Sequence, residues 1–198
     1  MLISPHHNFV FICTPKCAST AIEDGLSPYC GVKIGGTPQL KHATFAEYQT
    51  HIAPFLRAAG GVNPDRLTVL ALMREPMDWL ESWWRYRARP ALRDPNHPNH
   101  RNYTGDMSFE TFLDRYFGEP GVGLLRQHQH VVDVDGRHQG VEIFKYEEMR
   151  RFVDRVSGLI GRPVSFDNLN VSPRRRAHDV DRKYVDMLAA EYELYNRL

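Results

Sequence analysis

The sequence predicts an α/β fold with a mainly parallel central sheet flanked by helices. Two short apolar runs, residues 8–14 and 67–73, are typical of buried strands, and each passes directly into a segment with helical spacing. Alternation of strands and helices favours parallel strands within one sheet. The 198 residues show no repeat and no linker composition, so we expect a single domain over residues 1–198.

Capping residues, prolines and glycines give the helix boundaries. Helical spacing of apolar residues predicts helices at 18–26, 44–60, 77–89, 108–117, 146–160 and 181–198. Thr44 and Glu47 form a capping-box pattern. Pro76 suits the first turn of the helix that follows it, and Ser108 is a favourable N-cap. Gly161 is typical of a helix C-terminus, so it closes the amphipathic helix before it.

Two segments lack helical periodicity. Residues 90–107 hold three prolines, and we predict a long loop there. A loop of that length within a compact domain is usually functional. In residues 131–144, VVDVDGRHQGVEIF, the pattern predicts two short strands joined at Asp135-Gly136.

Composition limits the class of protein. Hydrophobic residues make up 42% and charged residues 25%, which is typical of a globular chain. A net charge of +1 gives no global field that would attract nucleic acid. The apolar runs are too short to span a bilayer, and no signal-peptide pattern is present. Three cysteines in such a chain are expected to be reduced, so we expect a cytoplasmic location.

The end of the first strand resembles a phosphate-binding turn. FVFIC is followed by Thr-Pro-Lys and then by the small residues Ala18, Ser19 and Thr20. A buried strand that turns into a helix presents free backbone N–H groups at the carboxyl edge of the sheet, where anions bind. Lys16 adds a mobile positive charge. The pattern differs from the P-loop pattern of nucleotide-binding proteins, in which lysine directly precedes the hydroxyl residue. A strand–turn–helix with a solvated lysine is the alternative.

The end of the second strand repeats this arrangement. Arg74 follows the strand, Pro76 begins a helix, and Ser82 lies on the second turn of that helix. The Ser82 hydroxyl and the Arg74 guanidinium are therefore expected to bind one anion together. An arginine at this position is often only a surface residue. Two such strand ends in one sheet favour a binding site.

The two stretches together resemble a known family. TPKCAST, residues 14–20, and REPMDWLESWWRY, residues 74–86, are similar to the paired signature of sulfotransferases that use 3′-phosphoadenosine 5′-phosphosulfate (PAPS). The similarity is to the carbohydrate branch, which includes heparan sulfate 2-O-sulfotransferases and bacterial homologues. It extends over residues 8–176 and includes residues 133–149 and the Asn170-Val-Ser172 turn. The resemblance implies a three-layer, P-loop-like fold.

The resemblance also implies the donor site. The first loop would hold the 5′-phosphosulfate of PAPS, and Arg74 with Ser82, eight positions apart, would hold its 3′-phosphate. Transfer of the sulfuryl group would proceed in line through a loose transition state, so that positioning and charge stabilisation carry the catalysis. Lys16 would neutralise charge on the leaving phosphate, and no metal is expected. The expected donor-binding residues are Pro15, Lys16, Cys17, Ala18, Ser19, Thr20, Arg74, Ser82, Ser172 and Arg174.

A general base must accept the proton of the acceptor hydroxyl, and histidine has a suitable pKa. His42 matches a histidine often found at this point in bacterial family members and is the first candidate. A solvent-facing histidine near a helix start is the alternative. His128 and His130 are second candidates. His97 and His100 are expected to contact solvent or substrate from the long loop.

The resemblance to the carbohydrate branch implies that the acceptor is a hydroxyl of a carbohydrate or glycolipid, and nothing else in the sequence bears on it. The helix after the first loop and residues 90–107 show no clear match to the family, and we expect acceptor recognition there. The run Arg174-Arg175-Arg176 is either a solvated cluster or a loop that closes over the donor.

Trp79, Trp83 and Trp84 are expected to be core residues, with Trp84 or Tyr86 as the candidate that reaches the cleft. A nucleotide-dependent kinase and a non-catalytic nucleotide-binding module are the alternative functions.

Overall fold

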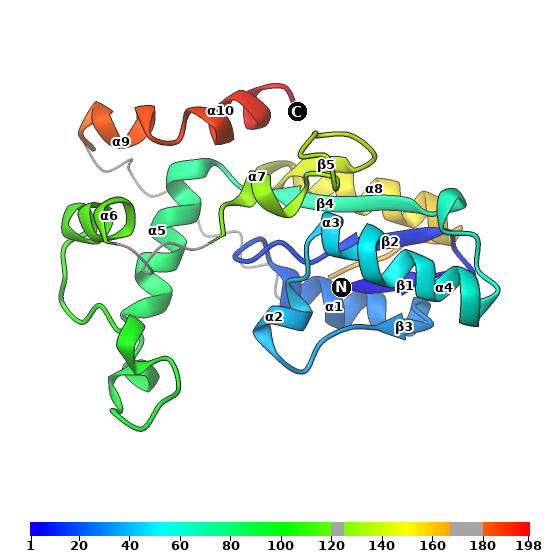
Figure 1. The fold of residues 1–198 in the computed structure, drawn as a ribbon, viewed down its shortest axis with the longest axis horizontal. Helices are drawn as coiled ribbons and strands as arrows, with labels where there is room; N and C mark the ends of the chain where they lie inside the picture. The colour runs from blue at the N-terminus through cyan, green and yellow to red at the C-terminus, as the bar shows by residue number, and fades with distance from the viewer. Residues whose placement is uncertain (120–124, 167–179) are drawn as a thin grey trace.

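The fold is α/β, as predicted. In the computed structural model, five strands form one mixed sheet in the order β3-β1-β2-β4-β5 (Figure 1). β2 (Phe9–Ile12), β4 (Thr68–Met73) and β5 (Glu142–Lys145) are parallel to one another. β1 (Leu2–Ser4) and β3 (Val32–Lys33) add two antiparallel pairings, so the parallel arrangement is confined to β2, β4 and β5. The structure describes residues 1–119, 125–166 and 180–198.

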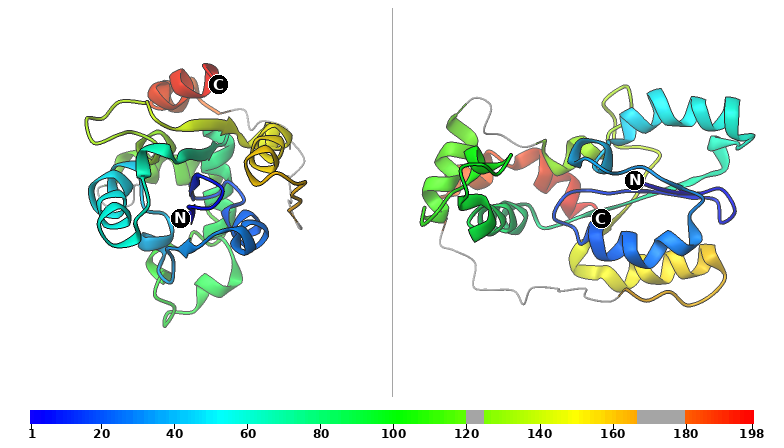
Figure 2. Two further views of the ribbon diagram at one scale, coloured as in Figure 1. Left: turned by 90° about the vertical axis from the view of Figure 1, so that its right-hand side faces the viewer. Right: turned by 90° about the horizontal axis from the view of Figure 1, so that it is seen from below.

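Helices cover both faces of the sheet (Figure 2). α1 (Ser19–Leu26) and α8 (Met149–Ile160) pack on one face. α3 (Phe45–Glu47), the π-helical turn η2 (Tyr48–Ile52) and α4 (Ala53–Gly60) pack on the other. The predicted capping box of Thr44 and Glu47 is present at the start of α3, and Gly161 ends α8 in the left-handed conformation, as predicted.

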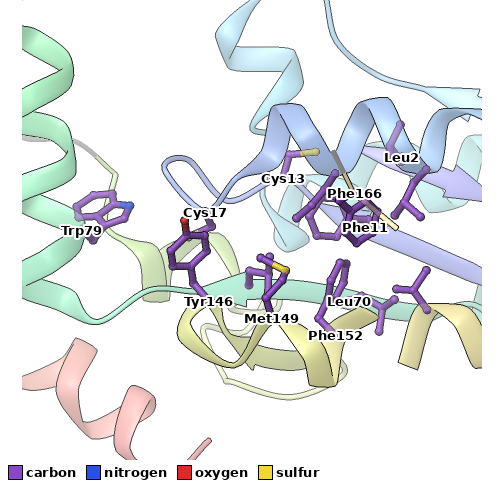
Figure 3. Packing of buried hydrophobic residues seen from close by; sticks show 14 of the residues in the cluster. Leu2, Phe11, Cys13, Cys17, Leu70, Trp79, Tyr146, Met149, Phe152 and Phe166 are labelled. Atoms are coloured by element: carbon purple, nitrogen blue, oxygen red, sulfur yellow. The ribbon is translucent and has the colours of Figure 1, made fainter. Parts of the chain in front are cut away.

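The continuous apolar sequence of β2 follows from burial on both sides. Phe9 and Phe11 point into the cluster under α1 and α8, whereas Val10 and Ile12 point into the cluster under α3 and α4. Each fully buried phenylalanine contributes about 1.5–3 kcal/mol of transfer free energy. The first cluster continues through Cys17 and Tyr146 to Trp79 (Figure 3).

A second group of helices lies beyond the carboxyl ends of the parallel strands (Figure 1). It comprises α5 (Pro76–Arg87), α6 (Phe109–Gly118), α7 (Gln127–His130), α9 (Arg182–Asp186) and α10 (Ala189–Asn196). α5 begins directly after β4, so it carries the residues that follow the second strand away from the sheet. Trp79 of α5 is 2% exposed and belongs to the first cluster, which ties this group of helices to the sheet.

Three predicted elements need correction. The hairpin at 131–144 is wrong: residues 142–145 form a strand, but residues 133–139 form a loop. There, the Asp133 carboxylate accepts hydrogen bonds from the backbone N–H groups of Asp135 and Arg137 and from the Gln139 amide. The final helix is interrupted between α9 and α10, at residues 187–188. The 90–107 loop contains two 3₁₀ turns, η4 (Pro90–Arg93) and η5 (His100–Asn102).

No helix in the described ranges is both long and apolar enough to traverse a bilayer.

Candidate functional site

A cleft of about 620 Å³ lies where β2 and β4 end. The two strands are adjacent and parallel, with Ile12 opposite Ala71, so the segments that follow them meet at one edge of the sheet. The residues that line the cleft are Pro15, Lys16, Ala18, Ser19, Thr20, Ala21, Gly36, Thr37, Pro38, Lys41, His42, Arg74, Ser82, Trp83, Tyr86 and Tyr146.

The loop between β2 and α1, residues 13–18, has an unusual backbone. Lys16 has a φ of 65° and Ala18 a φ of 55°, both in the left-handed region that non-glycine residues rarely adopt. A strain of about 1 kcal/mol or more per residue persists only where the surroundings impose it. Trp79 provides one such restraint, because its Nε1–H donates to the Pro15 carbonyl over 2.9 Å. Left-handed residues between right-handed ones turn successive N–H groups into a concave anion-binding surface.

The start of α1 has unsatisfied donors. Ala18 is the N-cap residue, no side chain of the described residues caps the helix, and no acidic residue lies in its first turn. Its first N–H groups therefore remain available at the cleft, together with the positive end of the helix dipole. α5 differs, because the Glu75 carboxylate already caps the N–H of Asp78.

Lys16 lies in a strongly positive environment. Its Nζ lies 4.1 Å from the centre of the Tyr86 ring and 5.5 Å from that of Trp83. The pKa of Lys16 is lowered to about 8, mainly by burial and in addition by the neighbouring cations Arg89 and Arg74. An anion bound at this point would relieve the repulsion among these cations.

Arg74 is 4% exposed and is held by several groups. Its Nε donates to the Asp78 carboxylate over 2.6 Å, and its guanidinium carbon lies 4.9 Å from the centre of the Tyr146 ring. Burial opposes the charged form, but the hydrogen bond to Asp78 and its negative charge raise the pKa of Arg74 overall. The guanidinium has five donors, so donors remain for a ligand. Ser82, four residues after Asp78, lines the same cleft.

Gln127 joins the two strand ends. Its side-chain amide accepts from the backbone N–H of Arg74 over 2.8 Å and donates to the Arg74 carbonyl over 2.9 Å. The Cys17 thiol donates to the same amide oxygen over 3.6 Å. Gln127 is 1% exposed, so these contacts are shielded from water. The side chain thus extends the hydrogen bonding of β4 and fixes Arg74 relative to the 13–18 loop.

His42 has a defined tautomer. Its Nδ1 lies 2.5 Å from the Cys13 carbonyl oxygen, which can only accept, so Nδ1 carries the proton. Nε2 is then the nitrogen that accepts a proton. Burial lowers the pKa of His42, although the hydrogen bond to Cys13 partly offsets this. The ring is therefore neutral near pH 7.

Lys41 also lies at the cleft. Its Nζ forms an ion pair with Glu23 at 2.7 Å and donates to the Thr20 hydroxyl over 3.1 Å. Glu23 is 5% exposed, so this pair fixes Lys41 beside the start of α1.

The structure brings together most of the predicted site residues. Those that line the cleft are Pro15, Lys16, Ala18, Ser19, Thr20, His42, Arg74 and Ser82. Cys17 does not line it, because its side chain is buried against Gln127. The predicted donor residues Ser172 and Arg174, and the rest of the 174–176 run, lie outside the described residues.

Other predictions are revised. Trp83 and Tyr86 line the cleft, whereas the indole N–H of Trp84 donates to the Met107 carbonyl. Residues 90–107 do not line it, and neither do the second-choice histidines. His130 is 3% exposed, and burial lowers its pKa to about 4. His128 lies beside Glu191 at 3.1 Å.

Sequence reasoning missed Lys41, Gln127 and Tyr146. Lys41 directly precedes His42, which is the one local signal that could have identified it. Gln127 and Tyr146 reach the site from distant parts of the chain, and no local pattern marks them.

Comparison with protein-family models, with curated proteins and with solved structures finds no match to this chain.

Proposed function

We propose that the protein is a PAPS-dependent sulfotransferase that moves a sulfuryl group to a hydroxyl of an acceptor. One observation carries the proposal: Lys16, Arg74 and His42 line a single cleft at the ends of two adjacent parallel strands. The sequence resemblance assigns these residues to the two ends of one donor and to the base. Their common cleft is what a single donor molecule would require.

The size of the cleft and its hydrogen-bond donors support a nucleotide of this kind. Its volume of about 620 Å³ lies within the range of about 300–1,000 Å³ typical of small-molecule sites. The 13–18 loop and the uncapped start of α1 offer backbone donors for the 5′-phosphosulfate. Arg74 and Ser82 offer charged and neutral donors for the 3′-phosphate. We infer, on the same basis, that the helices on both faces of the sheet form a three-layer, P-loop-like single domain.

Each of these residues has a separate role in the proposed reaction. His42 Nε2 accepts the proton of the acceptor hydroxyl, whose oxygen forms a bond to sulfur while the bond from sulfur to the phosphate oxygen breaks. Lys16 and the backbone donors of the loop stabilise the negative charge that develops on the leaving phosphate. Arg74 and Ser82 orient the donor, so that the acceptor, the sulfur and the leaving oxygen lie in line.

The acceptor is proposed from the resemblance alone to be a carbohydrate or a glycolipid. Gly36, Thr37 and Pro38 line the cleft together with His42, so we infer that they contact the acceptor. Residues 90–107 lie outside the cleft lining and are not proposed to contact the reacting hydroxyl.

A thermal-shift comparison tests the proposal against a kinase and against a non-binding module. We expect adenosine 3′,5′-bisphosphate to raise the melting temperature more than ATP with Mg²⁺, because a ligand that binds only the folded state stabilises it by mass action. The Arg74→Met variant should lose most of the bisphosphate effect. A larger shift with ATP and Mg²⁺ would favour a kinase, and no shift with either nucleotide would refute a nucleotide site.

A further inference from the structure

A small cavity lies away from the cleft, between the end of α5, the 90–107 loop and the start of α6. Its volume is about 20 Å³, enough for one particle about the size of a water molecule. Arg87, Arg101 and Arg115 line it, together with Thr104 and Phe112. Nothing in the proposed sulfuryl transfer uses this cavity.

Arg87 is a buried cation without an anionic partner. It is 5% exposed, and no carboxylate of the described residues forms an ion pair with it. Its guanidinium carbon lies 5.9 Å from the centre of the Trp83 ring and 5.8 Å from that of Phe112. These aromatic faces attract the charge but accept few of its five hydrogen bonds. A buried charge is normally paired, so the chemistry of the site favours an anion.

Two further groups point to the same conclusion. The Thr104 hydroxyl is buried and has no hydrogen-bond partner among the described residues, although most buried polar groups have one. Arg115 forms an ion pair with Glu119 at 3.1 Å, which offsets part of its charge, whereas Arg101 is exposed and adds a positive charge at the cavity. Burial lowers the pKa of Arg87, and the nearby Arg115 lowers it further against an opposing effect of Tyr116.

We propose that the cavity binds one monatomic anion of the chloride class, held by the Arg87 guanidinium and the Thr104 hydroxyl. The volume admits a halide ion, whereas a tetrahedral oxyanion such as sulfate would need a wider space. Water would satisfy the hydroxyl but would leave the arginine charge uncompensated.

The position of the cavity gives the anion a structural effect. The backbone N–H of Thr104 already donates to the Arg87 carbonyl over 3.3 Å, so the anion would add a second link between the 90–107 loop and α5. The Trp83 ring lies near both Arg87 and Lys16. The anion therefore holds the end of the helix that carries Trp83 and Tyr86 to the cleft.

Thermal unfolding in chloride and in gluconate at equal ionic strength tests this. Replacing gluconate by chloride at about 300 mM is expected to raise the melting temperature by about 2 °C or more, a readily measured shift for a chain of this length. Bromide should act like chloride. Equal melting temperatures in chloride and gluconate would overturn the proposal, because the cavity would then hold only water.

Variants test whether the effect of chloride on the melting temperature arises at the cavity. Arg87→Met and Thr104→Val are each expected to remove most of the chloride effect. Arg93→Met, an exposed arginine in the same loop, should retain it, and so should Arg74→Met in the cleft. If Arg74→Met removes the effect while Arg87→Met keeps it, halide binds in the cleft and the proposal is wrong.

A second measurement does not depend on the stability of any variant. Crystals of the wild-type protein grown with bromide should show one anomalous peak within hydrogen-bond distance of the Arg87 guanidinium and the Thr104 hydroxyl. Bromide sites elsewhere without one at this position would contradict the assignment.

Discussion

With the proposed nucleotide site, the lowered pKa of Lys16 predicts that nucleotide affinity depends on pH in a defined direction. Its pKa is about 8 in the ligand-free protein, mainly because the side chain is buried and also because Arg89 and Arg74 are nearby. A bound phosphate or phosphosulfate favours the charged lysine and raises this pKa. The affinity for adenosine 3′,5′-bisphosphate is therefore expected to be constant below the pKa of the ligand-free protein and to fall as the pH rises through it.

The size of the effect follows from the protonated fraction. With a pKa of about 8, this fraction falls from about nine tenths at pH ~7 to about one tenth at pH ~9. The dissociation constant should therefore rise about tenfold, or by about 1.4 kcal/mol. Titration calorimetry across this range measures it. The second phosphate pKa, near 6, leaves the ligand charge nearly constant in the same range.

Lys16→Arg is the matched control, because arginine stays charged throughout. Its affinity is expected to be weaker than that of the wild type, because the geometry differs, but not to change with pH between about 7 and 9. The same tenfold loss in Lys16→Arg, or a flat profile in the wild type, would refute the assignment of this titration to Lys16.

Three further predictions concern other residues of the site. Arg74→Met should weaken adenosine 3′,5′-bisphosphate by about tenfold or more, as expected for a lost charged hydrogen bond, but change adenosine 5′-phosphate by less than about threefold in calorimetry. His42→Ala should lower turnover by about 10²–10⁴-fold and leave bisphosphate affinity nearly unchanged, whereas the exposed His51→Ala should lower neither. Gln127→Ala should lower the free energy of unfolding in urea by about 2 kcal/mol or more, because it leaves the backbone N–H and carbonyl of Arg74 unpaired. The control Gln129→Ala, on the exposed side of α7, should lower it by less than about 1 kcal/mol.

Each of these has a result that would contradict it. Equal losses for both nucleotides in Arg74→Met would mean that Arg74 does not bind the 3′-phosphate. Turnover within about threefold of the wild type in His42→Ala would remove it as the base. Unchanged unfolding of Gln127→Ala would mean that its two contacts with Arg74 do not contribute to stability.

The central strands were predictable because their signals are local. β2 and β4 are short, continuous apolar runs, and burial on both faces explains that composition. Gly161 has a φ of 78° and ends α8, as the sequence predicts for a glycine at a helix C-terminus. β1 and β3 have three and two residues, too few to show a periodicity, and they were missed.

The hairpin at 131–144 shows how a local pattern misleads. Valine and aspartate alternate at 132–135, which is typical of a strand, but the Asp133 carboxylate accepts hydrogen bonds from backbone N–H groups of its own loop instead. In the candidate site, local patterns mark some residues and leave others unmarked. The Lys16 and Arg74 segments carry local motifs, whereas Gln127 lies 53 residues from Arg74 and depends on the tertiary fold for its role.

Transfer of labelled sulfuryl from PAPS to a panel of hydroxyl-bearing carbohydrates and glycolipids tests the central claim most directly. We predict labelled product with the wild-type protein, and a loss of about 100-fold or more in Lys16→Ala, since removing one preorganised donor costs about 2.7–4 kcal/mol. Lys16→Ala that keeps more than about a tenth of the wild-type rate, a difference under ~1.4 kcal/mol, would contradict the role of Lys16 in transfer.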